Sequence, residues 1–465
     1  MTRRTLGLVV ALALAVPVVT CKPAVRGNGR NLLLITLETT RADHLGTYGY
    51  ARQTSPRIDR LANAGVVFDR FSSVSPRTNP SLASLMTSRY PHEHGVRNLL
   101  LTLESEQLTL AEALQAAGYV SGAIQTHPRL IAASGFAQGF DDYRDDVTAH
   151  PLATQSVAAA VDWIREAAGG SRPWFLWLHL MDPHWTYDPP TGWRTEFGPE
   201  DPRPASLYAA LRNHEKTIGP VIFRNRMADD EIAAFIDLYD AEIRYTDDAI
   251  AELLRVIDEL GLRDGTVIAL TSDHGESLGE HDYFFEHGDL GTEPEIRVPM
   301  ILVAPGIIPP GLRIGSTAES LDVAPTLLDL LGLPPEDRFR GRTLIPLLES
   351  RDTDDRTCFG ETGKRFHEEN DRREIEGIAG KRRWIRRGNF KLVHTPKAEG
   401  APDRQLFDLT TSAAETEDVS HLYPELFAEL GAALDVWMAE DQGKDRDYHI
   451  TPEAREQLRA LGYVN

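Results

Sequence analysis

Three stretches of this 465-residue chain are almost entirely apolar, and an acidic residue follows each within three positions. They span residues 31–37, 173–180 and 266–270. Apolar runs of this length are typical of central strands in a parallel sheet that is covered on both faces. Amphipathic helical patterns lie between them, most clearly over residues 153–168 and 229–260. This alternation predicts an α/β fold with a large doubly wound, mostly parallel sheet.

The remaining patterns extend this fold and then change. Further strands are predicted at residues 119–125 and 298–303, and a helix at residues 321–331. After about residue 356 the spacing favours short antiparallel strands and two helices, at residues 382–386, 390–394, 405–408, 423–441 and 451–461. We therefore predict four parts: a signal or lipoprotein-type segment (1–21), a tether (22–30), a large α/β domain (31–350) and a smaller α+β subdomain (351–465).

The N-terminal segment predicts export. Arg3 and Arg4 precede an apolar run over residues 6–19, and Cys21 follows. A basic start, a short apolar stretch and a break are features of a secretory signal, and the run is too short for a comfortable membrane span. Cys21 stands where a bacterial lipoprotein carries its lipid. We expect a periplasmic or cell-envelope protein held at the membrane by this anchor or by the signal segment; an uncleaved anchor helix with an incidental cysteine is the alternative.

Net charge limits the kinds of binding partner, and the cysteine count limits the possible disulfides. The formal net charge is −21 and no basic block offsets it, which argues against nucleic acid as a partner. A local basic pocket stays compatible with this charge, because net charge governs solubility and steering and does not define a site. Cys358 is the second of two cysteines, so acylation of Cys21 would leave no intrachain disulfide.

Polar side chains at the ends of the predicted strands indicate a site. Glu38 follows the first strand, and Asp273 and His274 follow the strand at residues 266–270. Ligands of open α/β sheets bind outside the carboxyl ends of the strands. Thr78 begins a predicted helix as an N-cap with a proline in the first turn, so its hydroxyl would face unpaired N–H groups. An ordinary N-cap is the alternative for Thr78.

Together, Glu38, Thr78, Asp273 and His274 form a plausible ligand set for one divalent ion. Gly275 would allow the backbone bend through which the adjacent Asp273 and His274 reach the same ion. Such an ion would lower the pKa of the Thr78 hydroxyl and neutralise an attacked ester. Oxygen ligands with one imidazole suit Mn²⁺ or Zn²⁺ better than Ca²⁺, with Ca²⁺ or Mg²⁺ as alternatives.

Three further histidines follow predicted strands or lie near this edge: His127, His184 and His287. His184 and His287 suit the binding of the other ester oxygens or the protonation of the leaving oxygen. Each of these histidines alone is more often a satisfied surface or core residue. Their shared position makes them candidate catalytic residues.

These residues stand in motifs that resemble the sulfatase family, within the alkaline phosphatase superfamily. The resemblance is carried by Leu-Ile-Thr-Leu-Glu-Thr-Thr-Arg-Ala-Asp-His-Leu-Gly over residues 34–46, by Thr78-Asn-Pro-Ser, and by Ser272-Asp-His-Gly-Glu. It runs from about residue 31 to the C-terminus. It implies a metal-dependent hydrolase of phosphate or sulfate esters, with a small-molecule, glycan or lipid-headgroup ester as substrate.

The chain departs from that family at several positions. Thr78 stands where sulfatases have the cysteine or serine that becomes formylglycine, Leu82 replaces an arginine, and Glu38-Thr39 replaces an Asp-Asp pair. The set Glu, Thr, Asp and His resembles the single-metal site of lipoteichoic acid synthases and phosphoethanolamine transferases, in which a threonine attacks phosphorus. The resemblance implies Thr78 as nucleophile and a covalent intermediate.

Two other functions compete with a hydrolase. A phosphoethanolamine- or glycerophosphate-type transferase is the first, although the transferases of this kind carry several N-terminal membrane spans and this chain has one short apolar segment. A catalytically silent envelope-binding lipoprotein is the second. The intact set of four candidate ligands argues against it.

Overall fold

The structure is a computed structural model that describes residues 28–145, 152–206, 227–349, 355–362, 381–395 and 403–441. Cys21, the predicted signal segment and the helix predicted at residues 451–461 lie outside these ranges. Within them, no helix is both long enough and apolar enough to cross a membrane.

An eight-stranded sheet forms the centre of the molecule, in the order β10-β2-β9-β6-β1-β5-β3-β4. Its strands are β1 (Asn31–Leu37), β2 (Val66–Ser72), β3 (Val120–Ile124), β4 (Asp142–Arg144), β5 (Trp174–Leu180), β6 (Thr266–Ser272), β9 (Met300–Val303) and β10 (Leu312–Glu319). β9 runs antiparallel to β2 and β6, and the other paired strands are parallel. The predicted α/β fold with a large, mostly parallel sheet is confirmed.

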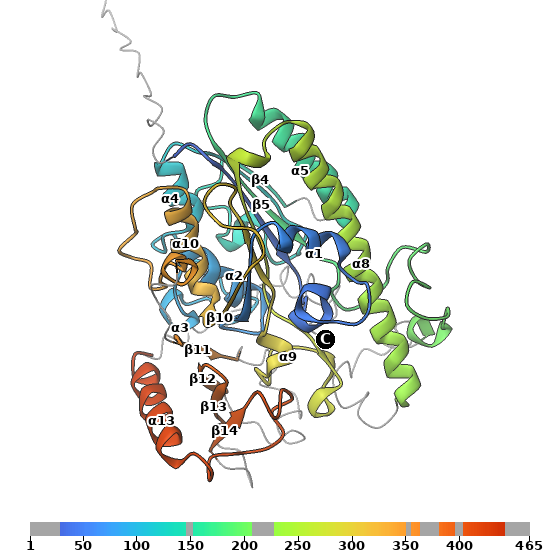
Figure 1. Cartoon of the computed structure of the whole chain (residues 1–465), viewed down its shortest axis with the longest axis vertical. Coiled ribbons are helices and arrows are strands. Elements are labelled where there is room, and N and C mark those ends of the chain that lie inside the picture. Colours follow the sequence, from blue (N-terminus) through green and yellow to red (C-terminus); the bar gives the residue numbers. More distant parts are fainter. Residues whose placement is uncertain are drawn as a thin grey trace, which may run out of the picture.

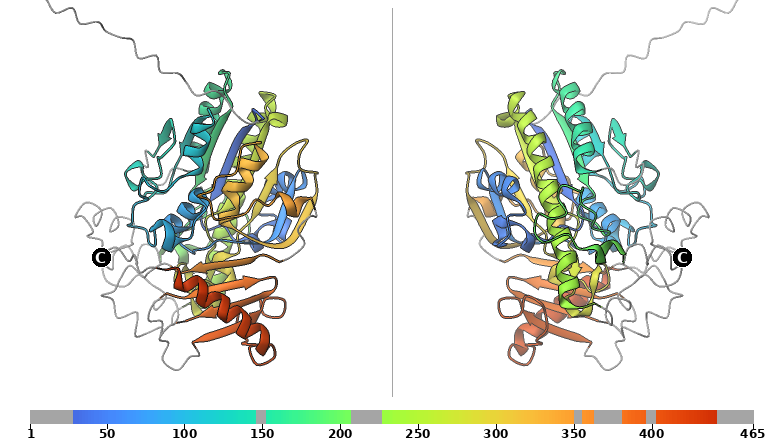
Figure 2. Two further views of the ribbon diagram at one scale, coloured as in Figure 1. Left: turned by 90° about the vertical axis from the view of Figure 1, so that its left-hand side faces the viewer. Right: turned by 90° about the vertical axis from the view of Figure 1, so that its right-hand side faces the viewer.

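Helices cover both faces of this sheet, which explains why its central strands are apolar throughout (Figure 2). Leu33, Ile35 and Leu37 of β1 pack into one buried cluster, and Leu32 and Leu34 pack into another on the opposite face. The first cluster includes side chains of α1 (Pro56–Asn63), α5 (Ala153–Ala168) and α8 (Asp229–Glu259). The second includes side chains of α2 (Thr78–Thr87), α4 (Leu110–Ala116), α10 (Val323–Leu330) and α11 (Ile345–Leu348).

Short elements complete the α/β part of the chain. They are η1 (Ala42–His44), η2 (Gly46–Tyr48), α3 (Pro91–His94), η3 (Ala132–Ser134), η4 (Arg263–Gly265), η5 (Glu280–Asp282), α9 (Glu293–Ile296) and η6 (Ser320–Asp322). A small two-stranded sheet pairs β7 (Ser277–Leu278) with β8 (Phe284–Glu286).

A second sheet of four antiparallel strands, β11-β12-β13-β14, follows in the chain. Its strands are β11 (Thr357–Glu361), β12 (Arg383–Arg387), β13 (Phe390–His394) and β14 (Arg404–Asp408). Helix α13 (Pro424–Ala439) packs on it, and both lie at one end of the molecule (Figures 1 and 2). The three predicted short strands are confirmed, whereas the placement of a domain boundary near residue 350 stays a prediction.

Candidate active site

The ends of three neighbouring strands are tied together at the edge of the sheet. The backbone N–H of Glu38 donates to the carbonyl of Leu180 (2.9 Å), and that of Asp273 donates to the carbonyl of Leu37 (3.1 Å). These bonds align the segments that leave β1, β5 and β6. Glu38, Asp273 and His274 are fully buried and come together with Thr78, which begins α2.

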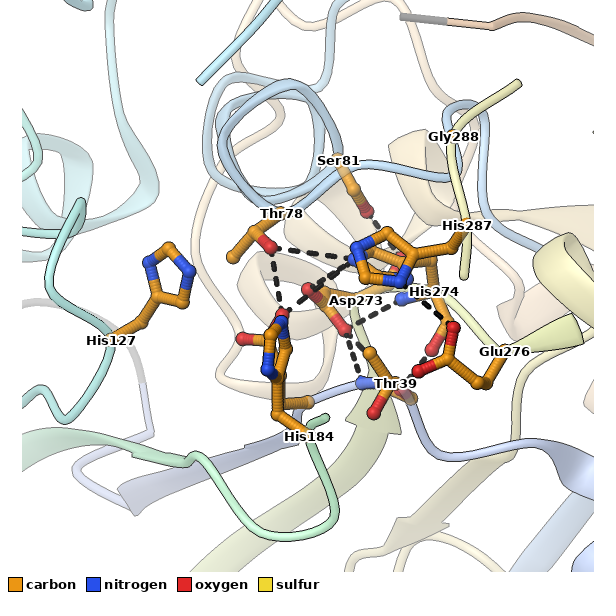
Figure 3. A network of polar contacts seen from close by, with 12 residues as sticks. Thr39, Thr78, Ser81, His127, His184, Asp273, His274, Glu276, His287 and Gly288 are labelled. Carbon is orange, nitrogen blue, oxygen red and sulfur yellow. Dashed lines mark hydrogen bonds and ion pairs between the residues drawn. The ribbon is translucent and has the colours of Figure 1, made fainter. Parts of the chain in front are cut away.

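Short distances connect these four side chains, of which Thr78, Asp273 and His274 are labelled in Figure 3. The Thr78 hydroxyl Oγ1 donates to Glu38 Oε1 (2.7 Å) and lies 3.3 Å from His274 Nε2. The same His274 Nε2 lies 3.2 Å from Asp273 Oδ2 and 3.6 Å from Glu38 Oε1. The structure thus brings together the predicted ligand set, while the roles of its members stay predictions.

The donor and acceptor pattern of this cluster fits a cation. His274 Nδ1 lies 2.9 Å from the carbonyl oxygen of Gly275, so Nδ1 carries the ring proton and Nε2 presents a lone pair. Burial lowers the pKa of His274 to about 3, which keeps the ring neutral. Asp273 Oδ2 accepts no hydrogen bond within the described part of the chain.

Electron-rich atoms of Glu38, Asp273 and His274 therefore face one another, all within 4.8 Å. Burial raises the pKa of Glu38 to about 7 and that of Asp273 to about 7, because neither carboxylate is solvated. A divalent ion among these atoms would compensate the buried negative charge.

The backbone around the cluster is held in an unusual shape. Thr39 has a φ of 45°, in the left-handed region, and its N–H donates to Asp273 Oδ1 (3.1 Å). The glycine that is expected to allow a backbone bend, Gly275, has a φ that is not positive. Glycine is needed at this position because the backbone of Pro294 comes close: a Cβ at Gly275 would stand 2.0 Å from the carbonyl oxygen of Pro294.

Thr78 is the first residue of helix α2, and its N-cap is Arg77. The prediction of Thr78 as the N-cap is therefore wrong by one position. The physical reason is that its hydroxyl turns towards Glu38 and makes no bond to its own helix. Ser81, one turn later, donates from Oγ to the carbonyl of Asp273 (2.5 Å) and ties α2 to the strand end.

The three candidate catalytic histidines lie in a row beside this cluster (Figure 3). Ring centroids are 4.3 Å apart for His274 and His287, 5.7 Å for His287 and His184, and 6.3 Å for His184 and His127. His127 Nδ1 accepts from the backbone N–H of Arg129 (3.1 Å), so its Nε2 carries the proton. This buried Nε2 has no hydrogen-bond partner among the residues that the structure describes.

The other two histidines are anchored through Nδ1. His184 Nδ1 lies 2.5 Å from the carbonyl oxygen of Trp185, and His287 Nδ1 lies 3.0 Å from Glu276 Oε1. Tyr187 donates from its hydroxyl to the other oxygen of Glu276 (3.2 Å). Burial raises the pKa of Glu276 to about 8 and lowers that of His287 to about 3, so at neutral pH Glu276 is protonated and His287 is neutral, with its ring proton on Nε2 when Nδ1 accepts from Glu276.

Sequence reasoning missed two residues of this network, His179 and Glu276. His179 is a buried histidine within β5, and its Nε2 lies 2.7 Å from Glu38 Oε2. A signal was present for it: His179 is the polar exception in the apolar run at residues 173–180. Glu276 stands in the segment after β6 and is fully buried, which its sequence position alone does not indicate.

Known families match this chain over most of its length. The family model Sulfatase matches residues 30–333, and the model N-sulphoglucosamine sulphohydrolase, C-terminal, matches residues 279–438. The ulvan-active sulfatase of Formosa agariphila is 26% identical over 384 residues, which cover 74% of this chain and 71% of that protein. The multifunctional alkaline phosphatase superfamily protein PehA of Trinickia caryophylli is 25% identical over 410 residues, covering 70% and 79%.

Solved structures share the fold. The phosphonate monoester hydrolase of Agrobacterium radiobacter superposes with a TM-score of 0.70 at 22% identity, covering 91% of this chain and 98% of that chain. A protein in complex with its substrate D-glucosamine-2-N,6-O-disulfate superposes with a TM-score of 0.72 at 21% identity, covering 90% and 100%. The chain therefore belongs to the sulfatase family of ester hydrolases, in the alkaline phosphatase superfamily.

Proposed function

We propose that this sulfatase-family hydrolase cleaves phosphate mono- or diesters with Thr78 as its nucleophile. The observation that supports this most is the environment of Thr78 Oγ1, which is buried between Glu38 Oε1 (2.7 Å) and His274 Nε2 (3.3 Å). By its motif, the position of Thr78 resembles the one at which sulfatases carry the residue that becomes formylglycine. Threonine offers a single oxygen and cannot supply the hydrated aldehyde, so Thr78 would act as a plain alkoxide.

Four residues would hold a divalent ion, for which Mn²⁺ or Zn²⁺ suits the donor set best: Glu38, Thr78, Asp273 and His274. When bound, the ion would supply the positive charge that lowers the pKa of the Thr78 hydroxyl and offsets the negative charge of the ester. Thr78 Oγ1, whose proton would be released to solvent when the ion binds, would then form a bond to phosphorus while the bond from phosphorus to the leaving oxygen breaks. In a second step water would attack the phosphothreonine, and its proton would restore His287 and Glu276 while the bond from phosphorus to Thr78 Oγ1 breaks. Phosphate leaves from a monoester and a phosphate monoester leaves from a diester, and Thr78 is again an alkoxide.

The row of histidines would bind the ester oxygens by hydrogen bonds and protonate the leaving oxygen. His127 Nε2–H is a buried donor whose protein partner is missing among the described residues, which suits an ester oxygen. Protonated Glu276 would donate to His287 Nδ1 (3.0 Å), so that His287 Nε2–H protonates the leaving oxygen while Nδ1 takes the proton of Glu276. His184, between these two rings, would bind a further ester oxygen.

A sulfate ester is the second candidate substrate, and a glycan sulfate is the form that the relatives favour. Both the ulvan-active sulfatase and the structure with the disulfated glucosamine carry such names. A transferase, with an alcohol in place of water in the second step, is the runner-up mechanism. We further propose export to the periplasm or cell envelope with Cys21 as a lipid anchor, in a segment outside the described residues.

The experiment compares Thr78→Ala and Thr78→Ser with the wild type on an aryl phosphate, a phosphodiester and an aryl sulfate, each with Mn²⁺, Zn²⁺ and Ca²⁺. Thr78→Ala is expected to lower phosphate-ester turnover roughly 10³-fold or more, because no nucleophile remains. Thr78→Ser keeps the oxygen and should keep part of the activity. Wild-type enzyme quenched in acid should carry a phosphoryl group on the peptide that contains Thr78.

Circular dichroism controls for folding, since the lost hydrogen bond to Glu38 costs about 1–3 kcal/mol. Undiminished turnover in folded Thr78→Ala would refute Thr78 as nucleophile. Faster turnover of the sulfate ester than of both phosphate esters would replace the proposed substrate by the second candidate.

A further inference from the structure

A line of four side chains leads from the hydrophobic core to Glu38. In the parallel register of β1 and β5, Thr36 pairs with His179 and Leu34 pairs with Trp177. Side chains two residues apart in a strand point to the same face of the sheet. Trp177 and His179 of β5 therefore lie on the same face as Thr36 of β1 and Glu38 beyond its end.

Three hydrogen bonds connect these side chains. Trp177 Nε1 lies 2.9 Å from Thr36 Oγ1, Thr36 Oγ1 lies 2.8 Å from His179 Nδ1, and His179 Nε2 lies 2.7 Å from Glu38 Oε2. Thr36, His179 and Glu38 are all fully buried. No bond in this line depends on solvent.

The chemistry of the two end members sets the direction of the line. An indole N–H can only donate, so Thr36 Oγ1 accepts from Trp177. As a ligand of the ion, Glu38 is an ionised carboxylate that can only accept, so His179 Nε2 carries the ring proton and donates to Glu38 Oε2 (2.7 Å). His179 Nδ1 is then the acceptor nitrogen of the neutral ring, and Thr36 Oγ1 donates to it (2.8 Å).

We propose that His179 is a positioning residue that fixes which oxygen of Glu38 is offered to the ion; this inference rests on the proposed metal site. His179 occupies Oε2, and the other oxygen, Oε1, faces Thr78 Oγ1 (2.7 Å) and His274 Nε2 (3.6 Å). A carboxylate that is free to rotate would offer either oxygen or both. Held by His179, Glu38 presents one oxygen in one orientation. Trp177 and Thr36 in turn hold the ring of His179 in the tautomer that can donate.

The test measures the affinity of the purified full chain for Zn²⁺ or Mn²⁺ alone, by competition with a chromogenic chelator. His179→Phe keeps an aromatic ring but removes the donor to Glu38, and we expect affinity to fall roughly 10- to 100-fold, as for other groups that orient metal ligands. His179→Gln keeps an N–H donor and should restore affinity to within about threefold of the wild type. Thr36→Val touches no candidate ligand, yet should weaken affinity about three- to tenfold, because His179 can then adopt either tautomer.

Thr266→Val is the matched control. Thr266 is a fully buried threonine of β6 at the end of the strand remote from Asp273, and its hydroxyl donates to the carbonyl of Leu262 (2.8 Å). The Thr266→Val variant should lose about as much stability as Thr36→Val does, but it should keep the ion affinity of the wild type.

Unchanged affinity in both His179→Phe and Thr36→Val would overturn the inference, and if His179→Phe does not fold, Thr36→Val decides. Equal weakening in His179→Gln and His179→Phe would also overturn it, because the donor would then be irrelevant. Failure of the proposed metal site is a distinguishable result, since the wild-type chain itself would then bind no ion.

Discussion

The ion-free protein should be destabilised by its own active site, and Asp273→Asn tests this. Asp273 and Glu38 are fully buried carboxylates, and burial raises the pKa of each to about 7. Asparagine keeps the shape of Asp273 and an oxygen that can accept from the N–H groups of Thr39 (3.1 Å) and His274 (2.7 Å). It removes the buried charge alone.

The size of the effect follows from the pKa. A rise in the pKa of Asp273 from 3.8 to about 7 corresponds to about 4 kcal/mol at about 1.4 kcal/mol per pH unit. The folded state binds this proton more tightly than the unfolded state, so stability falls as pH rises from 3.8 and the loss is complete above about 7. Without ion, Asp273→Asn should be about 2–4 kcal/mol more stable than the wild type at about pH 8, and equal to it at about pH 4.

Urea unfolding followed by tryptophan fluorescence, with a chelator present, measures this difference. Addition of Mn²⁺ or Zn²⁺ should offset or reverse this difference, because the wild type gains about 4.1 kcal/mol at an ion concentration of about 1,000 times Kd and the variant gains nothing. The control is Asp247→Asn. Burial also raises the pKa of Asp247 to about 7, but its carboxylate accepts from the backbone of Arg57 and Ile58, away from the candidate ligands.

Asp247→Asn should therefore keep the full ion-dependent gain. A wild type that becomes more stable as pH rises in the presence of chelator would refute the reasoning. So would an Asp273→Asn variant that is less stable than the wild type in chelator at about pH 8.

Two further predictions concern other parts of the chain. Glu361 is buried against Arg97 Nη2 (2.7 Å) and Lys381 Nζ (3.0 Å), and these cations hold its pKa well below the usual 4.5 despite the opposing effect of burial. Glu361→Gln should cost about 3–5 kcal/mol in urea unfolding at neutral pH. This difference should fade as pH falls below 4.5, because the unfolded wild type then binds a proton that the folded Glu361 carboxylate binds only at lower pH; a constant difference would contradict the assignment. Cys21→Ser should move the chain from the membrane fraction to the soluble periplasmic fraction, and an unchanged distribution would contradict lipid anchoring.

The centre of the sheet could be predicted because burial on both faces leaves a clear pattern in the sequence. β1, β5 and β6 have buried residues along nearly their whole length and therefore read as apolar runs. β2 and β10 escaped prediction because they lie towards one edge, where burial alternates or is broken. In β2 the sequence Val-Val-Phe-Asp-Arg-Phe-Ser places two half-buried charged residues inside the strand, which removes the apolar pattern.

The candidate ligands could be predicted for a related reason: the residues that come directly after parallel strands meet at one edge of the sheet. The sequence does not predict how those ligands are positioned. The bond from His179 to Glu38 depends on the register of β1 with β5, in which Thr36 pairs with His179. Register is a property of two strands that are more than 130 residues apart in the chain, and nothing in either strand alone states it.

The two departures from the sulfatase motif at Thr78 and Leu82 can be explained together. The motif resemblance implies that Leu82 replaces an arginine, and the Leu82 side chain is fully buried in the apolar cluster that includes α2. A cation near the site is Arg77, which precedes Thr78: a Cβ at Gly288 would stand 2.1 Å from its Nε, so the guanidinium lies against that glycine. Beyond the effect of burial, its charge further lowers the pKa of His287. In the proposed mechanism, neutral imidazole donors, a cation and a divalent ion would supply positioning and charge compensation. Phosphoryl transfer needs both, and a single threonine oxygen would then suffice as the nucleophile.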